Sequence, residues 1–129
     1  MDQQLLRKSV LTLPLFAVAV AAGQAQFTAH TRFRIHFAQL SMSDTGTGAG
    51  STAAVLKVNN VAITGASDLS IAGAAAGKSV TTKITAGTQY PGGHIVNPGD
   101  VVTVDITAIP ATTAPAKAVV YLDVTQVDA

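Results

Sequence analysis

The sequence of 129 residues contains no cysteine, no tryptophan and no glutamate. The lack of cysteine excludes disulfide bonds and thiolate metal sites. Charged residues make up only 12% of the chain, about half the usual share for a soluble domain. Threonine and valine are plentiful, whereas good helix formers for an exposed surface are scarce, so strands are favoured over long helices. With 48% hydrophobic residues, we expect one folded domain rather than a disordered chain.

The charges of the sequence are nearly balanced, with a formal net charge of +1. Binding to nucleic acid requires clustered lysine and arginine to neutralise phosphates, so we expect no nucleic-acid partner. Four of the eight basic residues lie in the first 34 positions, as two pairs on either side of an apolar segment: Arg7 with Lys8, and Arg32 with Arg34. We interpret each pair as making local contacts.

Residues 1–26 have the composition of a secretory signal, with two cations, an apolar run from Val10 to Ala22 and then small residues. The run also alternates in the manner of a strand after Pro14. It is too short and too interrupted for a membrane span of about 20 residues, so we expect no membrane partner. We predict a short arm over residues 1–8 and a first strand region over Ser9–Ala22, in a single domain of residues 9–129. If the run is a signal, an exported adhesin or pilus-like subunit is the alternative.

The last third of the chain alternates apolar and polar residues with the period of a half-buried strand. After a turn at Asn97–Asp100, the side chains of Val102, Val104 and Ile106 point to one side. A second alternating segment runs from Ala118 to Val127. These two segments predict a pair of closing β-strands.

Two upstream features extend this pattern. Asn59 and Asn60 tolerate positive φ and connect two short β-branched runs, which predicts a hairpin over Val55–Thr64. Between Arg32 and Met42 the apolar side changes parity, which predicts a β-bulge or a passage between sheets near Ala38. We expect a glycine-rich surface loop over Ser43–Ser51 and a long loop from Gly87 to Asp100. The whole pattern predicts an all-β, jelly-roll-like antiparallel β-sandwich of about eight strands.

The run AGAAAGKS, residues Ala72–Ser79, imitates a phosphate-binding loop. Such a loop works because it leads into a helix whose free N–H groups meet the anion. The residues that follow here, Val80 to Ile84, have the composition of a strand. We therefore expect a plain Gly/Ala loop and no nucleotide cofactor.

Candidate catalytic and metal-ligating residues lack the spacing that their chemistry requires. None of His30, His36 and His94 has a partner at the spacing of HxH or HExxH, so we interpret them as solvent-facing or interface residues. Asp105 and Asp123 are expected on neighbouring closing strands, as solvated outward positions. The sequence contains no GxSxG elbow. We predict that the protein is not an enzyme and uses no cofactor and no metal.

Three segments resemble a small β-sandwich domain that recurs among virion proteins of tailed bacteriophages. They are VLKVNNVAIT from Val55, VNPGDVVTVDIT from Val96 and AVVYLDVTQV from Ala118. They resemble the Asn-centred hairpin, the Gly-Asp strand and the final strand of that domain, and the likeness extends from Phe33 to the end of the chain. The matching residues are Lys57, Asn59, Ile63, Gly99, Asp100, Val104, Asp105, Ile106, Thr107, Val120, Leu122 and Val124.

The resemblance implies a structural role, because domains of this family occur as capsid decoration (cement) proteins, head fibres and parts of tail fibres. We expect a decoration protein on the outer capsid surface of the virion, bound to the major capsid protein and to itself as a homo-oligomer, with a trimer as the expected form. The alternative is a receptor- or carbohydrate-binding module of a head or tail fibre. The residues predicted to bind partners are Asp2, Leu5, Leu6, Arg7 and Lys8 in the arm, and Tyr90 and His94 in the long loop.

Overall fold

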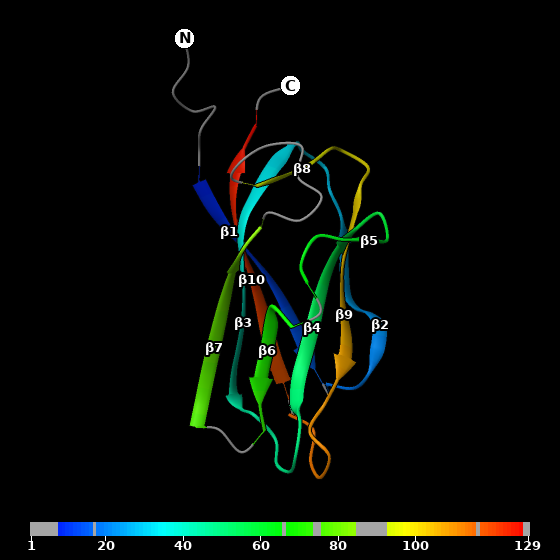
Figure 1. Ribbon diagram of the computed structural model, residues 1–129. Coiled ribbons are helices and arrows are strands. Elements are labelled where there is room, and N and C mark those ends of the chain that lie inside the picture. The colour runs from blue at the N-terminus through cyan, green and yellow to red at the C-terminus, as the bar shows by residue number, and fades with distance from the viewer. Residues whose placement is uncertain are drawn as a thin grey trace.

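The computed structural model describes residues 8–16, 18–65, 67–73, 76–84, 93–115 and 117–127. These residues form ten β-strands and no helix, arranged as two antiparallel sheets that pack face to face (Figure 1). The predicted all-β sandwich is therefore confirmed. Residues 1–7 of the predicted arm lie outside the described residues, and Lys8 is the first residue of β1.

Each sheet contains five strands. The first sheet has the order β1-β10-β3-β7, and the short strand β8 also pairs with β3. Its strands are β1 (Lys8–Phe16), β3 (Phe33–Asp44), β7 (Ala76–Lys83), β8 (His94–Val96) and β10 (Lys117–Gln126). The second sheet has the order β2-β9-β4-β5, and β6 also pairs with β4. Its strands are β2 (Ala21–Thr28), β4 (Ser51–Val58), β5 (Val61–Ala62), β6 (Leu69–Ala72) and β9 (Val101–Ala108).

The strand pairing is nested along the chain. Strand β1 pairs with β10, β2 with β9, β3 with β7 and β8, and β4 with β5 and β6. This nesting accounts for the difference between about eight predicted strands and ten observed ones. Two of the eight positions are each filled by two strands. Strands β7 and β8 pair with different parts of β3, and β5 and β6 pair with different parts of β4.

The core lies between the two sheets and contains the residues that the alternation predicted. Val102, Val104 and Ile106 are fully buried, and Leu122 from the last strand meets them from the other sheet's side of the core. Ile63, which follows the hairpin, is also buried in this cluster. Burial of such side chains is the main favourable term in folding, at about 25 cal/mol per Å² of apolar surface.

The predicted β-bulge is present, slightly before Ala38. Asp123 of β10 is opposite Phe37, but the next residue, Val124, is opposite Ile35, so His36 is the extra residue. The bulge allows Ile35 and Ala38 to be buried together, while His36 and Phe37 both reach the outer surface of the sheet. The change of parity in the sequence is therefore caused by a bulge within one strand and not by a passage between the two sheets.

The predicted hairpin is also confirmed. Asn59 and Asn60 have φ values of 51° and 69°, and Val58 pairs with Val61 across them. Two successive residues with positive φ are typical of the type I′ turn that matches the twist of a two-residue hairpin.

Two loop predictions need correction. His94–Val96 forms β8 instead of a loop, because it pairs with Phe33–Ile35, the part of β3 that β7 does not reach, and buries Ile95 and Val96. The glycine-rich segment after β3 is not simply a surface loop, since Gly46 is buried and a Cβ there would collide with the Thr113 carbonyl.

The strand boundaries near the start of the chain also differ from the prediction. The expected first strand region, Ser9–Ala22, is divided between two sheets, because β1 ends at Phe16 and β2 begins at Ala21. The chain crosses from one sheet to the other between these strands.

Candidate functional site

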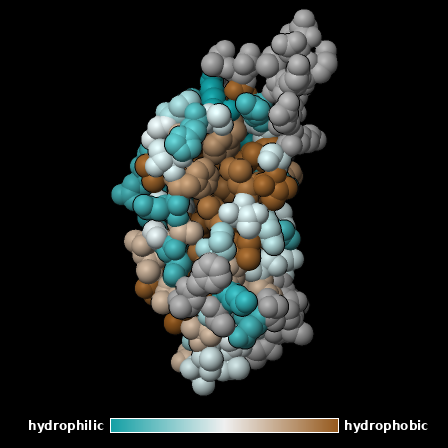
Figure 2. Space-filling model, turned by 180° about the vertical axis from the view of Figure 1, so that it is seen from behind, coloured by the Kyte–Doolittle hydropathy of each residue, from teal (hydrophilic) through white to brown (hydrophobic). Residues whose placement is uncertain are grey.

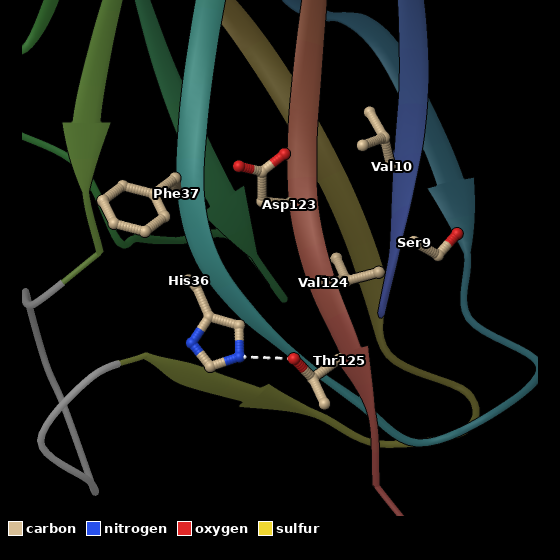
Figure 3. Close-up of a pocket in the computed structure, with 7 residues that line it drawn as sticks. All are labelled: Ser9, Val10, His36, Phe37, Asp123, Val124 and Thr125. Atoms are coloured by element: carbon tan, nitrogen blue, oxygen red, sulfur yellow. Dashed lines mark hydrogen bonds between the residues drawn. The ribbon is translucent and has the colours of Figure 1, made fainter. Parts of the chain in front are cut away.

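A groove of about 480 Å³ lies on the outer face of the first sheet (Figure 3). It crosses the three adjacent strands β1, β10 and β3 at the end of the sheet where β1 begins. Its lining residues are Ser9, Val10, His36, Phe37, Asp123, Val124 and Thr125. We call these residues the first-sheet groove.

A carboxylate lies between two exposed apolar side chains in this groove. Val10, Asp123 and Phe37 are cross-strand neighbours in one row of the sheet. The side chains of Val10 and Phe37 are 56% and 41% exposed, which is unusual for large apolar residues of a β-strand. Asp123 is exposed and forms no ion pair within the described part of the chain. This row offers apolar contact on both sides of one negative charge.

The bulge fixes one wall of the groove. Because His36 is the extra residue of β3, its ring reaches over β10, where Nε2 lies 2.7 Å from Oγ1 of Thr125 (Figure 3). A hydrogen bond at this distance holds the imidazole in place beside Phe37. The wall is therefore set by the fold and not by an incoming partner.

A second hollow, of about 410 Å³, lies on the other side of the first residues of β1. It is lined by Leu11 and by Phe27 and Phe33, whose rings are stacked with their centroids 6.3 Å apart. Ser9 and Val124 line both hollows. Seen from behind, the upper half of the molecule carries an extended apolar area, whereas its lower half is mixed (Figure 2).

The outer face of the second sheet carries a different carboxylate. Asp105 was expected to be solvated, but the residue is only 8% exposed. One carboxylate oxygen lies 2.7 Å from Nζ of Lys57, and the other accepts a hydrogen bond of 2.7 Å from the Gly23 N–H. Burial raises the pKa of Asp105, but the hydrogen bonds from Lys57 and Gly23 and the charge of Lys57 outweigh it and hold the pKa below its usual value.

The expectation that Asp105 and Asp123 lie on neighbouring strands is also wrong. Strand β9 belongs to the second sheet and β10 to the first, so the two carboxylates are on opposite sides of the molecule's core. They cannot act together on one substrate.

A third acidic residue, Asp100, ties two turns together. Its carboxylate accepts hydrogen bonds of 2.9 Å from the Asn97 backbone N–H and from the Asn59 side chain. The Asn59 side-chain oxygen accepts a further bond of 2.9 Å from the Val101 N–H. The hydrogen bonds from Asn97 and Asn59 lower the pKa of Asp100, which burial opposes and nearby His94 supports.

These contacts explain the polar residues on which the phage-protein resemblance depends. Lys57 and Asn59 come from one resembling segment, and their partners Asp105 and Asp100 come from another. The Lys57–Asp105 pair joins β4 to β9. The Asn59–Asp100 pair joins the turn after β4 to the turn before β9. They stabilise the fold, and neither pair lies in the first-sheet groove.

Of the predicted partner-binding residues, the structure describes Lys8, at the start of β1, and His94, in β8. Asp2, Leu5, Leu6, Arg7 and Tyr90 lie outside the described residues, so their role stays a prediction. His94 is half-buried in β8 and does not line the groove. Burial lowers the pKa of its imidazole, and the charge of Asp100 only partly opposes this.

Sequence reasoning missed the groove as a unit. The alternation alone indicates that Val10 and Asp123 point outward, and the parity change indicates an outward Phe37. The sequence does not reveal that β10 pairs with both β1 and β3, and this pairing places the three side chains in one row.

The phosphate-loop-like run leads into a strand. The structure describes Ala76–Lys83 as β7, so its Gly-Lys-Ser does not precede a helix N-terminus. Over the described ranges, the structure contains no group of three or more residues suited to hold a metal ion. Nor does the described part include a helix long and apolar enough to cross a membrane.

Comparison with known proteins finds likeness in structure but not in sequence. No family model matches the sequence, and no curated protein matches it. Among solved structures, a chain of "Capsid of Ralstonia phage GP4" has a TM-score of 0.56 and 18% sequence identity. The match covers 95% of this chain and 86% of that chain. The protein thus shares its fold, over nearly its whole described sandwich, with a chain of a bacteriophage capsid.

Proposed function

We propose that this protein is a non-enzymatic structural protein of a tailed bacteriophage, which decorates the outside of the capsid and stabilises it by bridging major capsid subunits. The observation that carries the proposal is the structural match to a chain of a phage capsid, because it covers 95% of one chain and 86% of the other. A match of this extent involves the whole sandwich and not a shared fragment of a larger protein.

The surface of the first sheet supports a role in protein contact. One complete cross-strand row of its outer face, formed by Thr12, Tyr121, Gln39 and Thr81, is neutral. Within the described residues of these strands, the acidic side chains are Asp123 and, at the very end of β3, Asp44. Protein interfaces are depleted of charge at their centre and enriched in tyrosine, so this face suits docking against another protein.

The open edges of the sandwich support self-association. Strands β1 and β7 are the edges of the first sheet, and each presents unpaired backbone groups on one side. Pro14 interrupts the donors of β1, which limits uncontrolled pairing. A closed homo-oligomer, with a trimer as the expected form, would cover such edges.

Imaging of labelled protein on phage particles tests the proposal. Purified protein carrying a gold label is added to heads that lack it, and the particles are examined by electron microscopy. We expect regular labelling of the shell and binding that saturates at a fixed ratio to the major capsid protein.

Two results of this experiment contradict the proposal. Label confined to the tail or to fibre tips would favour the receptor-binding alternative. Absence of binding to heads, with protein that is folded by circular dichroism, would exclude decoration altogether. A protein unfolded by prior heating is the control for adhesion through exposed apolar segments.

A further inference from the structure

The first-sheet groove displays a charge without a described partner. Asp123 is exposed between Val10 and Phe37, and the ion pair that the structure describes elsewhere is formed by Lys57 and Asp105 on the other sheet. A partner that places a cation on the carboxylate and apolar side chains beside it would use all three residues. The groove therefore fits a segment in which large apolar residues adjoin an arginine or lysine.

The face does not fit a second copy of itself. A twofold contact centred on this groove would bring two Asp123 carboxylates together, and like charges opposed in an interface are destabilising. The occupant must come from a different part of the surface.

The sequence contains two places where two large apolar residues directly precede a cation. One is Val55–Lys57, but it lies within β4, where Leu56 is fully buried and Lys57 is bound to Asp105. The other is Leu5–Arg7, followed by a second cation at Lys8. By composition, Leu5–Arg7 is the segment of this chain that matches the groove.

The geometry of β1 favours a groove on another copy. Lys8 pairs with Thr125 at the end of the β1–β10 ladder, and the groove extends from there along β1 toward Val10. Leu5 and Leu6 of the same copy would have to reverse direction within Arg7 to lie over Val10. Leu5 is three residues from Lys8, a distance of about 10 Å at full extension, so the groove must belong to a copy that packs against this end of β1.

We propose that the first-sheet groove binds residues Leu5–Arg7 of a second copy of this chain, with the Arg7 guanidinium on the Asp123 carboxylate and the leucines against Val10 and Phe37. An arginine suits this position because its planar fork pairs with a carboxylate through two hydrogen bonds. The contact joins unlike surfaces, so repeating it gives a closed ring where the rotation between copies closes and an open chain where it does not. This gives the arm a partner other than the capsid and does not depend on the proposed function.

A charge exchange tests the pairing without any capsid. The oligomeric state of the wild type, Asp123→Arg, Arg7→Asp and the double variant is measured by sedimentation equilibrium over a wide concentration range. We expect the wild type to associate, each single variant to weaken association by about tenfold or more, and the double variant to recover it. Thr81→Arg is the matched control, because it adds the same cation to an exposed site on β7 outside the groove and should leave association unchanged.

Three outcomes overturn the proposal: a wild type that is monomeric throughout, single variants that associate like the wild type, and a folded double variant that does not recover. Circular dichroism establishes that each variant is folded. Failure here leaves shell binding untouched, so it is distinguishable from failure of the proposed function.

Cysteine trapping provides a second measurement that does not depend on charge. Because the chain has no cysteine, the double variant Leu6→Cys/Val10→Cys contains the sole two thiols. Under mild oxidation we expect covalent oligomers on a non-reducing gel. A single limiting mass indicates a closed ring and gives its number of copies, whereas a ladder of increasing masses indicates an open chain. A monomer with an internal disulfide, or no disulfide at all, would contradict the contact between copies.

Discussion

Asp105 and Asp123 occupy equivalent positions in the two closing strands, yet the molecule uses them differently. Each lies between apolar residues that point into the core. Asp105 is 8% exposed and is bound on both oxygens, whereas Asp123 is exposed and without an ion-pair partner in the described structure. Asp105 therefore stabilises the fold, whereas Asp123 is available for contacts at the surface.

The neighbouring strands cause this difference. Beside Asp105, the register of β2 shifts between Ala21 and Ala25, and Gly23 adopts a φ of 64° that turns its N–H toward the carboxylate. On the other side, β4 supplies Lys57. Lys57 reaches Asp105 from two residues beyond Val55, which is directly opposite. The residues directly opposite Asp123 are Val10 and Phe37, whose side chains carry neither a donor nor a charge. A carboxylate on the outside of a sheet is thus structural or available for binding according to the adjacent strands.

The largest expected effect follows from removing the buried carboxylate. We expect Asp105→Ala to lower the free energy of unfolding by about 3 kcal/mol, since it leaves Lys57 and the Gly23 N–H without their partner. Urea unfolding followed by circular dichroism measures this change. The matched variant Asp123→Ala should stay within about 0.5 kcal/mol of the wild type. Equal losses in the two variants would refute the structural distinction between the two aspartates.

Removing the cation has the next largest expected effect. Lys57→Met keeps the length of the side chain but leaves the Asp105 carboxylate with the Gly23 hydrogen bond as its main support. We expect a loss of about 2 kcal/mol, the usual contribution of a hydrogen bond to a charged group. Lys117→Met is the control, because Lys117 is an exposed lysine at the start of β10. An unchanged urea midpoint for Lys57→Met would show that the ion pair adds nothing.

Acid provides a graded version of the same test. The pKa of Asp105 is lowered in the folded state, so its stabilisation is present above the ordinary aspartate value of about 4 and is lost as the pH falls through the folded value. We expect the urea midpoint of the wild type to fall between pH 5 and pH 2. Asp105→Ala should show a shallower fall, with the remainder due in part to Asp100. Parallel curves for the two proteins would contradict a role for Asp105 in acid sensitivity.

The smallest expected effect concerns the backbone that holds Asp105. Gly23→Ala introduces a Cβ whose nearest neighbour is Oε1 of Gln26 at 3.5 Å, so there is room for it. The cost comes from the positive φ alone and should be about 1 kcal/mol. Asn tolerates this conformation better than Ala, so Gly23→Asn should lower the melting temperature less than Gly23→Ala when both variants are compared with the wild type by thermal unfolding. The reverse order would indicate a steric origin.

Local patterns in the sequence were sufficient to predict much of the fold. Alternation identified the closing strands, the Asn59–Asn60 pair identified the hairpin, and the parity change in β3 identified its bulge. Each of these features is decided by residues that are close together in the chain. The period of two and the tolerance of asparagine for positive φ are properties of the segment itself.

The remaining features depend on residues that are far apart in the sequence. Strand β8 forms because β7 leaves the beginning of β3 uncovered, which no local pattern of His94–Val96 reveals. The burial of Asp105 requires Gly23, 82 positions earlier, to be turned toward it. The groove likewise depends on β10 lying between β1 and β3. Long-range pairing was therefore the missing information for the candidate site.

The nested pairing has a consequence for how the protein is made. β1 and β10 lie near opposite ends of the sequence, and pairing between them completes the first sheet. During synthesis, β1 cannot pair with β10 until the last strand has left the ribosome, so the leucines of β1 stay without their neighbouring strand until then. Such distant pairing makes folding slow, with a transient apolar edge exposed to other nascent chains. A cell that produces this protein in many copies would depend on its chaperones during that interval.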